Sequence, residues 1–254
     1  MFTALETLKL KGIKISKEEE KSAMLAILLH DVGHGPFSHA LESLLMEDWH
    51  HEKLSILLMK KLNDEFNGEL DLAIEMFQGK YHRKFFNQLI TSQLDVDRLD
   101  YLKRDSFFTG VSEGSVNTQR IISMMNVKDD ELLIDEKGVY SIENFLTARM
   151  FMYWQVYYHK TSALAEHLLV KILSRAKQLI SEGKQVEAYG NLKYFLYKTD
   201  FEKATEEDVN RFTQLDDTDV LSAIKTWQNA DDFVLSYFCK AVVQRKFPKT
   251  VFSS

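Results

Sequence analysis

The sequence is poor in cysteine, proline and glycine, and each shortage excludes a class of protein. Its 254 residues include 1 cysteine, 2 prolines and 10 glycines. The lone cysteine, Cys239, excludes an internal disulfide framework and indicates a reducing compartment. Because proline and glycine punctuate the many turns of sandwiches and barrels, their scarcity favours a helical protein.

The chain also lacks long apolar runs and an excess of basic charge. No run reaches the roughly 20 residues of a membrane span, and no signal-peptide pattern follows Met1. We therefore expect a cytoplasmic protein without a membrane partner. The formal net charge of −6 argues against nucleic acid as the main partner, because phosphate backbones are bound by clustered lysine and arginine.

Caps and hydrophobic periodicity predict a mostly helical chain. Ser16 to Glu19 has the spacing of a capping box and begins a helix that delivers His30-Asp31 at its end. A β-hairpin is predicted near 131–142, around the turn Glu136-Lys137-Gly138. Further helices are predicted over 40–46, 51–66, 70–77, 84–91, 94–105 and 142–180, with three or four more between 186 and 243, one of them capped at Asp216.

Chemically active side chains gather where the first of these helices ends. Residues 30–39 have the sequence HDVGHGPFSH, with three histidines and one aspartate among glycines. Histidine and aspartate are ligands for Zn, Mn and Fe, and glycine allows close approach of a ligand. A structural turn with incidental histidines is the alternative, and the coincidence of all these features disfavours it. Two ligands do not hold a catalytic metal, so others must come from elsewhere.

A second group of side chains lies in residues 94–105. On a helix, Asp97, Tyr101 and Asp105 follow at steps of four, and Arg98 borders the same face. The apolar arc that can face the core is formed by Val96, Leu99 and Leu102. The polar face is either a functional surface or a solvated, salt-bridged one, and spacing leaves both interpretations open.

Two further groups are more ambiguous. His51 and Glu52 stand at the start of a predicted helix, and the segment alone favours surface residues. A helical spacing is also shared by Arg149, Tyr153, Val156 or Tyr157, and Lys160. That pattern fits an aromatic core stripe, or aromatic and cationic side chains that contact a nucleotide.

Together these motifs resemble the HD-domain metal-dependent phosphohydrolases, and most of all their deoxynucleoside triphosphate triphosphohydrolase branch of the SAM-and-HD-domain type. The resemblance covers roughly residues 18–177 and rests on residues 30–39, 95–105 and 157–160. It implies an all-α HD-domain bundle over 1–180 with the small hairpin inserted. A helical extension over 181–254 would pack on that bundle.

The resemblance assigns a role to each singled-out residue. The implied ligands of a divalent metal (Mn, Fe, Zn, Ni or Mg) are His30, Asp31 and Asp97. The implied catalytic residues near the α-phosphate are His34 and His51, with Glu52 orienting His51. The resemblance also implies residues that bind the substrate. His39 would line the pocket, and phosphates would be held by Arg98, Arg149 and Lys160. The deoxyribose would contact Tyr101 and Asp105, and Tyr157 would limit the room at its 2′ position.

The activity implied is hydrolysis of a dNTP to a deoxynucleoside and tripolyphosphate, by a homo-oligomer. One alternative is an HD hydrolase of another nucleotide, a nucleoside monophosphate or an alarmone. Another is a catalytically silent module for nucleotide binding or oligomerisation.

The chain departs from the family pattern at its start. The family carries a further metal-binding histidine some tens of residues before His30-Asp31, and no histidine occurs in residues 1–29. We expect that the first helix is truncated, because the chain is a fragment or starts at an internal methionine. The other explanation is a natural variant whose metal site is weakened or lost.

Overall fold

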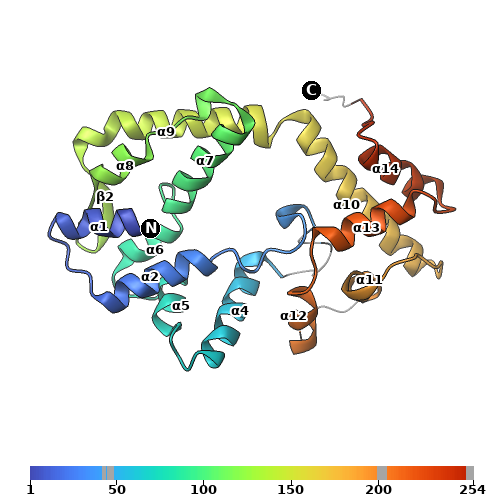
Figure 1. The fold of residues 1–254 in the computed structure, drawn as a ribbon, viewed down its shortest axis with the longest axis horizontal. Helices are drawn as coiled ribbons and strands as arrows, with labels where there is room; N and C mark the ends of the chain where they lie inside the picture. Colours follow the sequence, from blue (N-terminus) through green and yellow to red (C-terminus); the bar gives the residue numbers. More distant parts are fainter. Residues whose placement is uncertain (42–43, 45–48, 199–204, 250–254) are drawn as a thin grey trace. The chain divides into compact units, whose positions relative to one another are not determined.

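The chain is built from helices and one small antiparallel hairpin in the computed structural model (Figure 1). The structure describes residues 1–41, 44, 49–198 and 205–249. The predicted all-α class is confirmed. None of the helices in these described residues combines the length and apolar composition of a membrane span.

The chain divides into two compact units, one formed by residues 1–31 and 55–159 and the other by residues 32–54 and 160–254. The helices of the first unit are α1 (Phe2–Leu10), α2 (Lys17–Leu29), most of α4 (His51–Glu65), α5 (Asp71–Phe77), α6 (Lys84–Ile90), α7 (Val96–Thr109), η2 (Ser112–Gly114), α8 (Thr118–Met124), η3 (Glu136–Gly138), α9 (Val139–Met152) and η4 (Tyr153–Tyr157). Those of the second are η1 (Ser38–Ala40), α10 (Lys160–Ser181), α11 (Gly190–Tyr197), α12 (Glu206–Phe212), α13 (Asp217–Trp227) and α14 (Phe233–Val243). The domain boundary predicted after residue 180 stays a prediction, because a compact unit and a family domain are different things.

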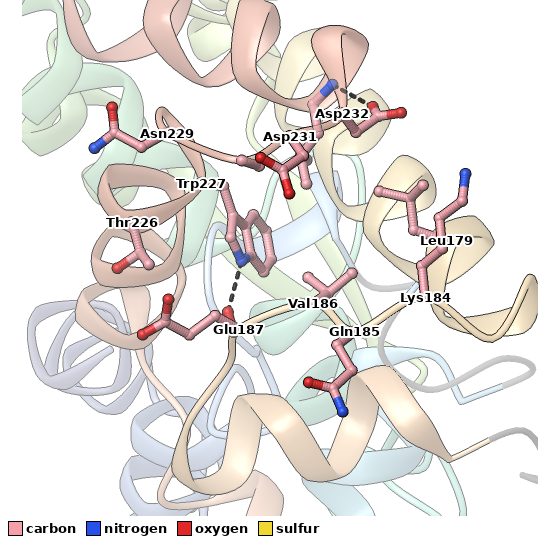
Figure 2. A pocket seen from close by; sticks show the side chains of 12 residues that line it. Leu179, Lys184, Gln185, Val186, Glu187, Thr226, Trp227, Asn229, Asp231 and Asp232 are labelled. Carbon is pink, nitrogen blue, oxygen red and sulfur yellow. Dashed lines mark hydrogen bonds between the residues drawn. The ribbon is translucent and has the colours of Figure 1, made fainter.

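The second unit has a core along one face of α10. Leu169, Ile172 and Ala176 recur at helical spacing and are buried against α11, α13 and α14. A pocket of about 680 Å³ opens beside the end of α10, where Trp227 donates a hydrogen bond from Nε1 to the carbonyl of Glu187 over 2.6 Å (Figure 2). Within the described residues, the lining of this pocket includes none of the predicted site residues.

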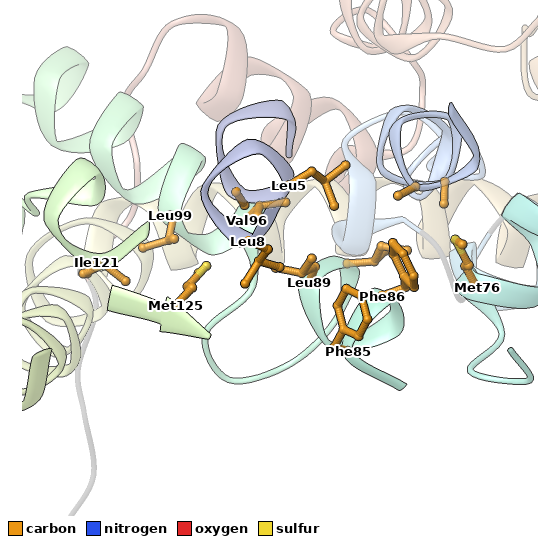
Figure 3. Close-up of a cluster of buried hydrophobic side chains, with 14 of the residues drawn as sticks. Leu5, Leu8, Met76, Phe85, Phe86, Leu89, Val96, Leu99, Ile121 and Met125 are labelled. Carbon is orange, nitrogen blue, oxygen red and sulfur yellow. The ribbon is translucent and has the colours of Figure 1, made fainter. Parts of the chain in front are cut away.

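The first unit has its own core, which holds α2 and α7. The rings of Phe85 and Phe86 from α6 are fully buried and stacked, with centroids 4.1 Å apart (Figure 3). Ala26 of α2 and Leu99 of α7 belong to the same buried cluster. The predicted apolar arc of α7 is confirmed, because Val96, Leu99 and Leu102 are all buried. The end of α2 and the first turns of α7 are therefore fixed by packing.

The capping signals begin helices where they are predicted. Ser16 Oγ accepts from the Glu19 amide over 3.1 Å, and Glu19 Oε2 accepts from the Ser16 amide over 2.7 Å. Asp216 forms an equivalent capping box at the start of α13. Of the helix predicted over 40–46, residues 42–43 and 45–46 lie outside the described residues, and Ala40 ends η1.

The predicted hairpin is present, but its turn lies elsewhere. Strands β1 (Met125–Lys128) and β2 (Glu131–Ile134) pair antiparallel, and the turn is Asp129-Asp130, with φ of 53° and 58°. Aspartate tolerates this left-handed backbone and so supports a two-residue hairpin turn. The predicted turn Glu136-Lys137-Gly138 instead forms η3 and leads into α9.

The prediction of one helix over 142–180 is wrong. α9 ends at Met152, and η4 is a π-helical turn in which the Tyr158 amide donates to the Tyr153 carbonyl over 2.7 Å. α10 then begins at Lys160. A π turn needs neither glycine nor proline, so the sequence carried no break signal.

Candidate metal and phosphate site

His30 lies at the end of α2 with its ring orientation fixed. Gly33 and Gly35 follow the end of the helix, and glycine is a poor helix former. His30 Nδ1 donates a hydrogen bond to the Ile27 carbonyl over 2.7 Å. That bond places the proton on Nδ1 and leaves Nε2 as a lone-pair donor, as in metal-binding histidines.

The free nitrogen of His30 faces two carboxylates. Nε2 lies 3.5 Å from Asp31 Oδ2 and 3.7 Å from Asp97 Oδ1, the latter in the first turn of α7. These distances exceed hydrogen-bond range. Among the described residues, buried Nε2 has no hydrogen-bond partner. The structure thus brings His30, Asp31 and Asp97 together, as the resemblance implies.

The charges of His30 and Asp97 shift each other's pKa values. Burial lowers the pKa of His30, but Asp97 and Asp31 outweigh burial and leave that pKa raised. The neighbouring imidazole holds the pKa of Asp97 below its usual value. Asp97 is therefore a carboxylate near neutral pH and is available as a ligand.

These residues fit a divalent metal. One imidazole nitrogen with an oriented tautomer and two carboxylate oxygens suit Mn, Fe or Zn. Ligand atoms about 2.1 Å from one ion stand roughly 3 to 3.5 Å apart, close to the separations of 3.5 and 3.7 Å in this structure. His30 links the group, since it is near both carboxylates.

A histidine cluster lies in the second unit. The rings of His34 and His51 stack, with centroids 4.2 Å apart, and His39 meets both edge-on at 4.8 and 4.9 Å. Their ligand nitrogens lie within 4.8 Å of one another. The three histidines predicted for catalysis and substrate binding are therefore neighbours, although their roles stay predictions. We call His34, His39 and His51 the histidine cluster.

For Glu52 and Lys160, the structure gives a position but, among the described residues, no side-chain contact that would define a role. Glu52 is exposed in the first turn of α4, next to His51 in the chain. Lys160 is exposed as the first residue of α10, in the unit that contains the histidine cluster. Their proposed orienting and phosphate-binding roles stay predictions.

Arg98 is held on α7 by groups that precede the helix. Its Nε donates to the Ser92 carbonyl over 2.7 Å and lies 3.1 Å from Asp95 Oδ2. Asp95 is buried and caps α7 by accepting from the Arg98 amide over 2.7 Å. With Nε occupied, the terminal nitrogens of Arg98 can bind an anion in a fixed orientation.

The predicted face of α7 continues toward η4. Tyr157 donates a hydrogen bond from its hydroxyl to Asp105 Oδ2 over 2.7 Å, and the Tyr101 ring lies 6.2 Å from the Tyr157 ring. Arg149 Nη1 donates to Gln93 Oε1 over 3.2 Å, and its guanidinium lies 5.6 Å from the Tyr153 ring. All these residues belong to the first unit.

Sequence reasoning missed two supporting residues. Asp95 anchors Arg98, and Gln93 contacts Arg149. The position of Asp95 just before the helix was a usable N-cap signal. No local pattern connects Gln93 with Arg149, which is 56 residues away.

Comparison with known proteins identifies the family. Residues 3–105 match the HD domain, and residues 116–193 match the HD associated region. The chain belongs to the HD-domain phosphohydrolase family. Over 236 residues the HD-domain chain is 35% identical to uncharacterized protein YwfO of Bacillus subtilis, an alignment that covers 90% of this chain and 52% of YwfO.

Two other relatives of the HD-domain chain carry an activity in their names. One is the deoxynucleoside triphosphate triphosphohydrolase SAMHD1 homolog of Dictyostelium discoideum, 29% identical over 192 residues, with coverage of 69% of this chain and 37% of the homolog. The other is the solved structure of a phosphohydrolase from Bacteroides thetaiotaomicron, with 48% identity and a TM-score of 0.93. That match covers 97% of this chain and 62% of the other. For comparison, the chain spans about half the length of the curated relative YwfO.

Proposed function

We propose that this chain is a metal-dependent phosphohydrolase that converts a dNTP to a deoxynucleoside and tripolyphosphate. The observation that carries the proposal is His30, whose Nδ1–H is held by the Ile27 carbonyl while Nε2 faces Asp31 and Asp97. The name of the Dictyostelium relative supports the choice of a dNTP.

His30, Asp31 and Asp97 are the residues that would hold the metal. The chemistry that an ion supplies at such a site is Lewis-acid polarisation of a phosphoryl oxygen. Arg98 and Arg149 neutralise charge on the triphosphate, and each is preset by a contact with the protein: Arg98 with Ser92 and Asp95, and Arg149 with Gln93. Two oriented cations favour a polyphosphate over a monophosphate.

Asp105, Tyr101 and Tyr157 form the proposed sugar end of the site. The Asp105 carboxylate can accept a hydrogen bond from a sugar hydroxyl while it also accepts from Tyr157. The Tyr157 ring then occupies space that a 2′-hydroxyl would need. This arrangement supports a preference for deoxyribose.

The histidine cluster is the proposed source of the proton for the leaving 5′-oxygen. Histidine exchanges protons near neutral pH, and His34 and His51 have stacked rings. His39 is proposed to line the same pocket, Glu52 to orient His51, and Lys160 to add a phosphate contact. These roles follow the family resemblance residue by residue.

The deciding experiment is product analysis. The chain, and a version extended by the codons that precede Met1 in its gene, are incubated with Mn²⁺ and each dNTP. Ion-exchange chromatography is expected to show equal amounts of deoxynucleoside and tripolyphosphate. Release of orthophosphate or pyrophosphate would contradict the proposal, as would the absence of any product.

The same assay distinguishes the alternatives. Faster turnover of a deoxynucleoside monophosphate or an alarmone than of dNTP would identify another HD hydrolase. Binding of dNTP by calorimetry without metal or turnover would identify a silent module. Light scattering with and without dNTP tests the further proposal that the chain works as a homo-oligomer. Cell fractionation tests the proposed cytoplasmic location.

A further inference from the structure

The turn inside residues 34–39 has an unusual backbone. Phe37 has φ 55° and ψ 24°, and Ser38 has φ 48°, so two consecutive non-glycine residues are left-handed. The Ser38 amide donates to the Gly35 carbonyl over 3.0 Å and closes the turn. A bulky side chain at positive φ persists only where surrounding contacts hold it.

Two contacts from the α12–α13 segment hold this turn. The Phe37 amide donates a hydrogen bond to Asp217 Oδ1 over 2.7 Å, although the two residues are 180 positions apart. On the other side, a Cβ added to Gly35 would come within 2.7 Å of the Phe212 ring. The Asp217 carboxylate therefore holds the turn at Phe37, and the Phe212 ring packs against it at Gly35.

Both contacting residues are themselves well fixed. Asp217 is the first residue of α13, and Asp216 caps that helix by accepting from the amides of Thr218 and Asp219. The Phe212 ring is buried and meets the Phe195 ring edge-on, with centroids 6.1 Å apart. The residues of the α12–α13 segment that contact the turn are thus held by capping and packing contacts of their own.

The supported turn separates two members of the histidine cluster. His34 precedes Gly35 and His39 follows Ser38, and their rings lie 4.8 Å apart. The spacing of these rings therefore depends on the left-handed backbone between them. We propose that Asp217 is a positioning residue for the histidine cluster, acting through its hydrogen bond with the Phe37 amide. Only the kinetic part of this inference rests on the proposed function.

The test compares Asp217→Ala with Asp217→Asn in the full chain. Asparagine keeps a side-chain oxygen that can accept from the Phe37 amide, whereas alanine does not. Glu206→Ala is the matched control, because it removes a carboxylate from the same first position of α12. Histidine Cε1–H resonances are recorded by NMR and assigned with His→Gln variants. Circular dichroism checks the fold, and kcat and KM are measured for dNTP.

The expected result is specific to alanine at position 217. The His34 and His39 resonances shift in Asp217→Ala, while that of His82, which belongs to the first unit, stays in place. Asp217→Asn and Glu206→Ala match the parent. The kcat of Asp217→Ala falls by about tenfold or more with little change in KM, since a misplacement of about 1 Å can cost roughly 100-fold.

Each contrary result is distinguishable. Unchanged His34 and His39 resonances in Asp217→Ala overturn the inference, and so does an equal shift in Asp217→Asn, which would assign the effect to charge. Shifted resonances in a chain that hydrolyses no dNTP leave the positioning role standing and reject the proposed function.

Discussion

The hydroxyl of Tyr157 donates a hydrogen bond to the Asp105 carboxylate across 2.7 Å, joining η4 to the last part of α7. Burial raises the pKa of Tyr157, and Asp105 raises it further. The phenol therefore stays protonated throughout the pH range of ordinary enzyme assays. The pair links residues 52 positions apart and fixes the edge of the proposed sugar site.

Replacing Tyr157 should relax the choice of sugar. In Tyr157→Ala the space beside Asp105 opens to a 2′-hydroxyl, and we expect the preference for dATP over ATP to fall by about tenfold or more. The measurement is kcat/KM for both nucleotides. Tyr157→Phe is the control, since it keeps the ring and loses only the hydroxyl. A preference that survives the alanine substitution would remove Tyr157 from the sugar site.

Asp97 and Asp100 on α7 provide a matched pair for the metal. Asp97 faces His30, whereas Asp100 is exposed and pairs with Arg104 at 2.6 Å, a surface contact of little energy. Asp97→Ala should lose bound Mn²⁺ by elemental analysis and lose more activity than the roughly 10–100-fold typical of an outer ligand partner. Asp100→Ala should retain both. Metal retained by Asp97→Ala would place that residue outside the ligand set.

Asp95 should contribute to both stability and substrate binding. It is buried, caps α7 and contacts Arg98, and burial raises its pKa despite the amides of Ser92 and Arg98. Asp95→Ala is expected to lower the free energy of unfolding by about 1–3 kcal/mol and to raise KM. Asp95→Asn should lose less stability, because asparagine is also a good N-cap. Urea unfolding and steady-state kinetics check both effects, and identical losses in the two variants would refute the capping role.

Stability of the second unit should fall in acid through Asp232. Arg175 donates to its carboxylate over 2.6 and 3.1 Å and lowers the pKa of Asp232 to about 2. Because the pKa is lower in the folded chain than the roughly 3.9 of an unfolded aspartate, this contribution is complete above about pH 4 and is lost as pH falls through about 2. Thermal midpoints of Asp232→Asn, measured from pH 2 to 6, should show a weaker acid dependence than the parent. Parallel curves would count against this assignment.

Local signals predicted much of the fold, and longer-range effects account for the misses. Ser16 and Asp216 each carry a side chain that satisfies nearby amides, so the sequence alone locates these helix starts. The hairpin turn was misplaced because Lys137-Gly138 is a stronger turn signal than Asp129-Asp130, although the latter pair adopts the turn. The position of the turn is set by the register in which β1 and β2 pair, and composition does not determine that register.

In the candidate site too, local patterns were predictable from the sequence and long-range contacts were not. Helical spacing predicted that Asp97, Tyr101 and Asp105 share a face of α7. The family resemblance, rather than spacing, implied that His34, His39 and His51 lie at one pocket. The contact of Tyr157 with Asp105 and that of Phe37 with Asp217 join distant segments, so no periodicity reveals them. Arg98 was singled out by its residue type. Its anchor is the backbone carbonyl of Ser92, and no sequence pattern indicates that contact.

The π-helical turn of η4 makes this family site sensitive to insertions and deletions. Its bond from the Tyr158 amide to the Tyr153 carbonyl accommodates one residue more than an α-helical turn would. Loss of one codon there would restore α-helical pairing and swing the following side chain by about 100° around the axis. Tyr157 would then point away from Asp105 with every proposed site residue still encoded. On the proposed role of Tyr157, a length change of one residue would alter the choice of sugar, and a comparison of residue identities would overlook it.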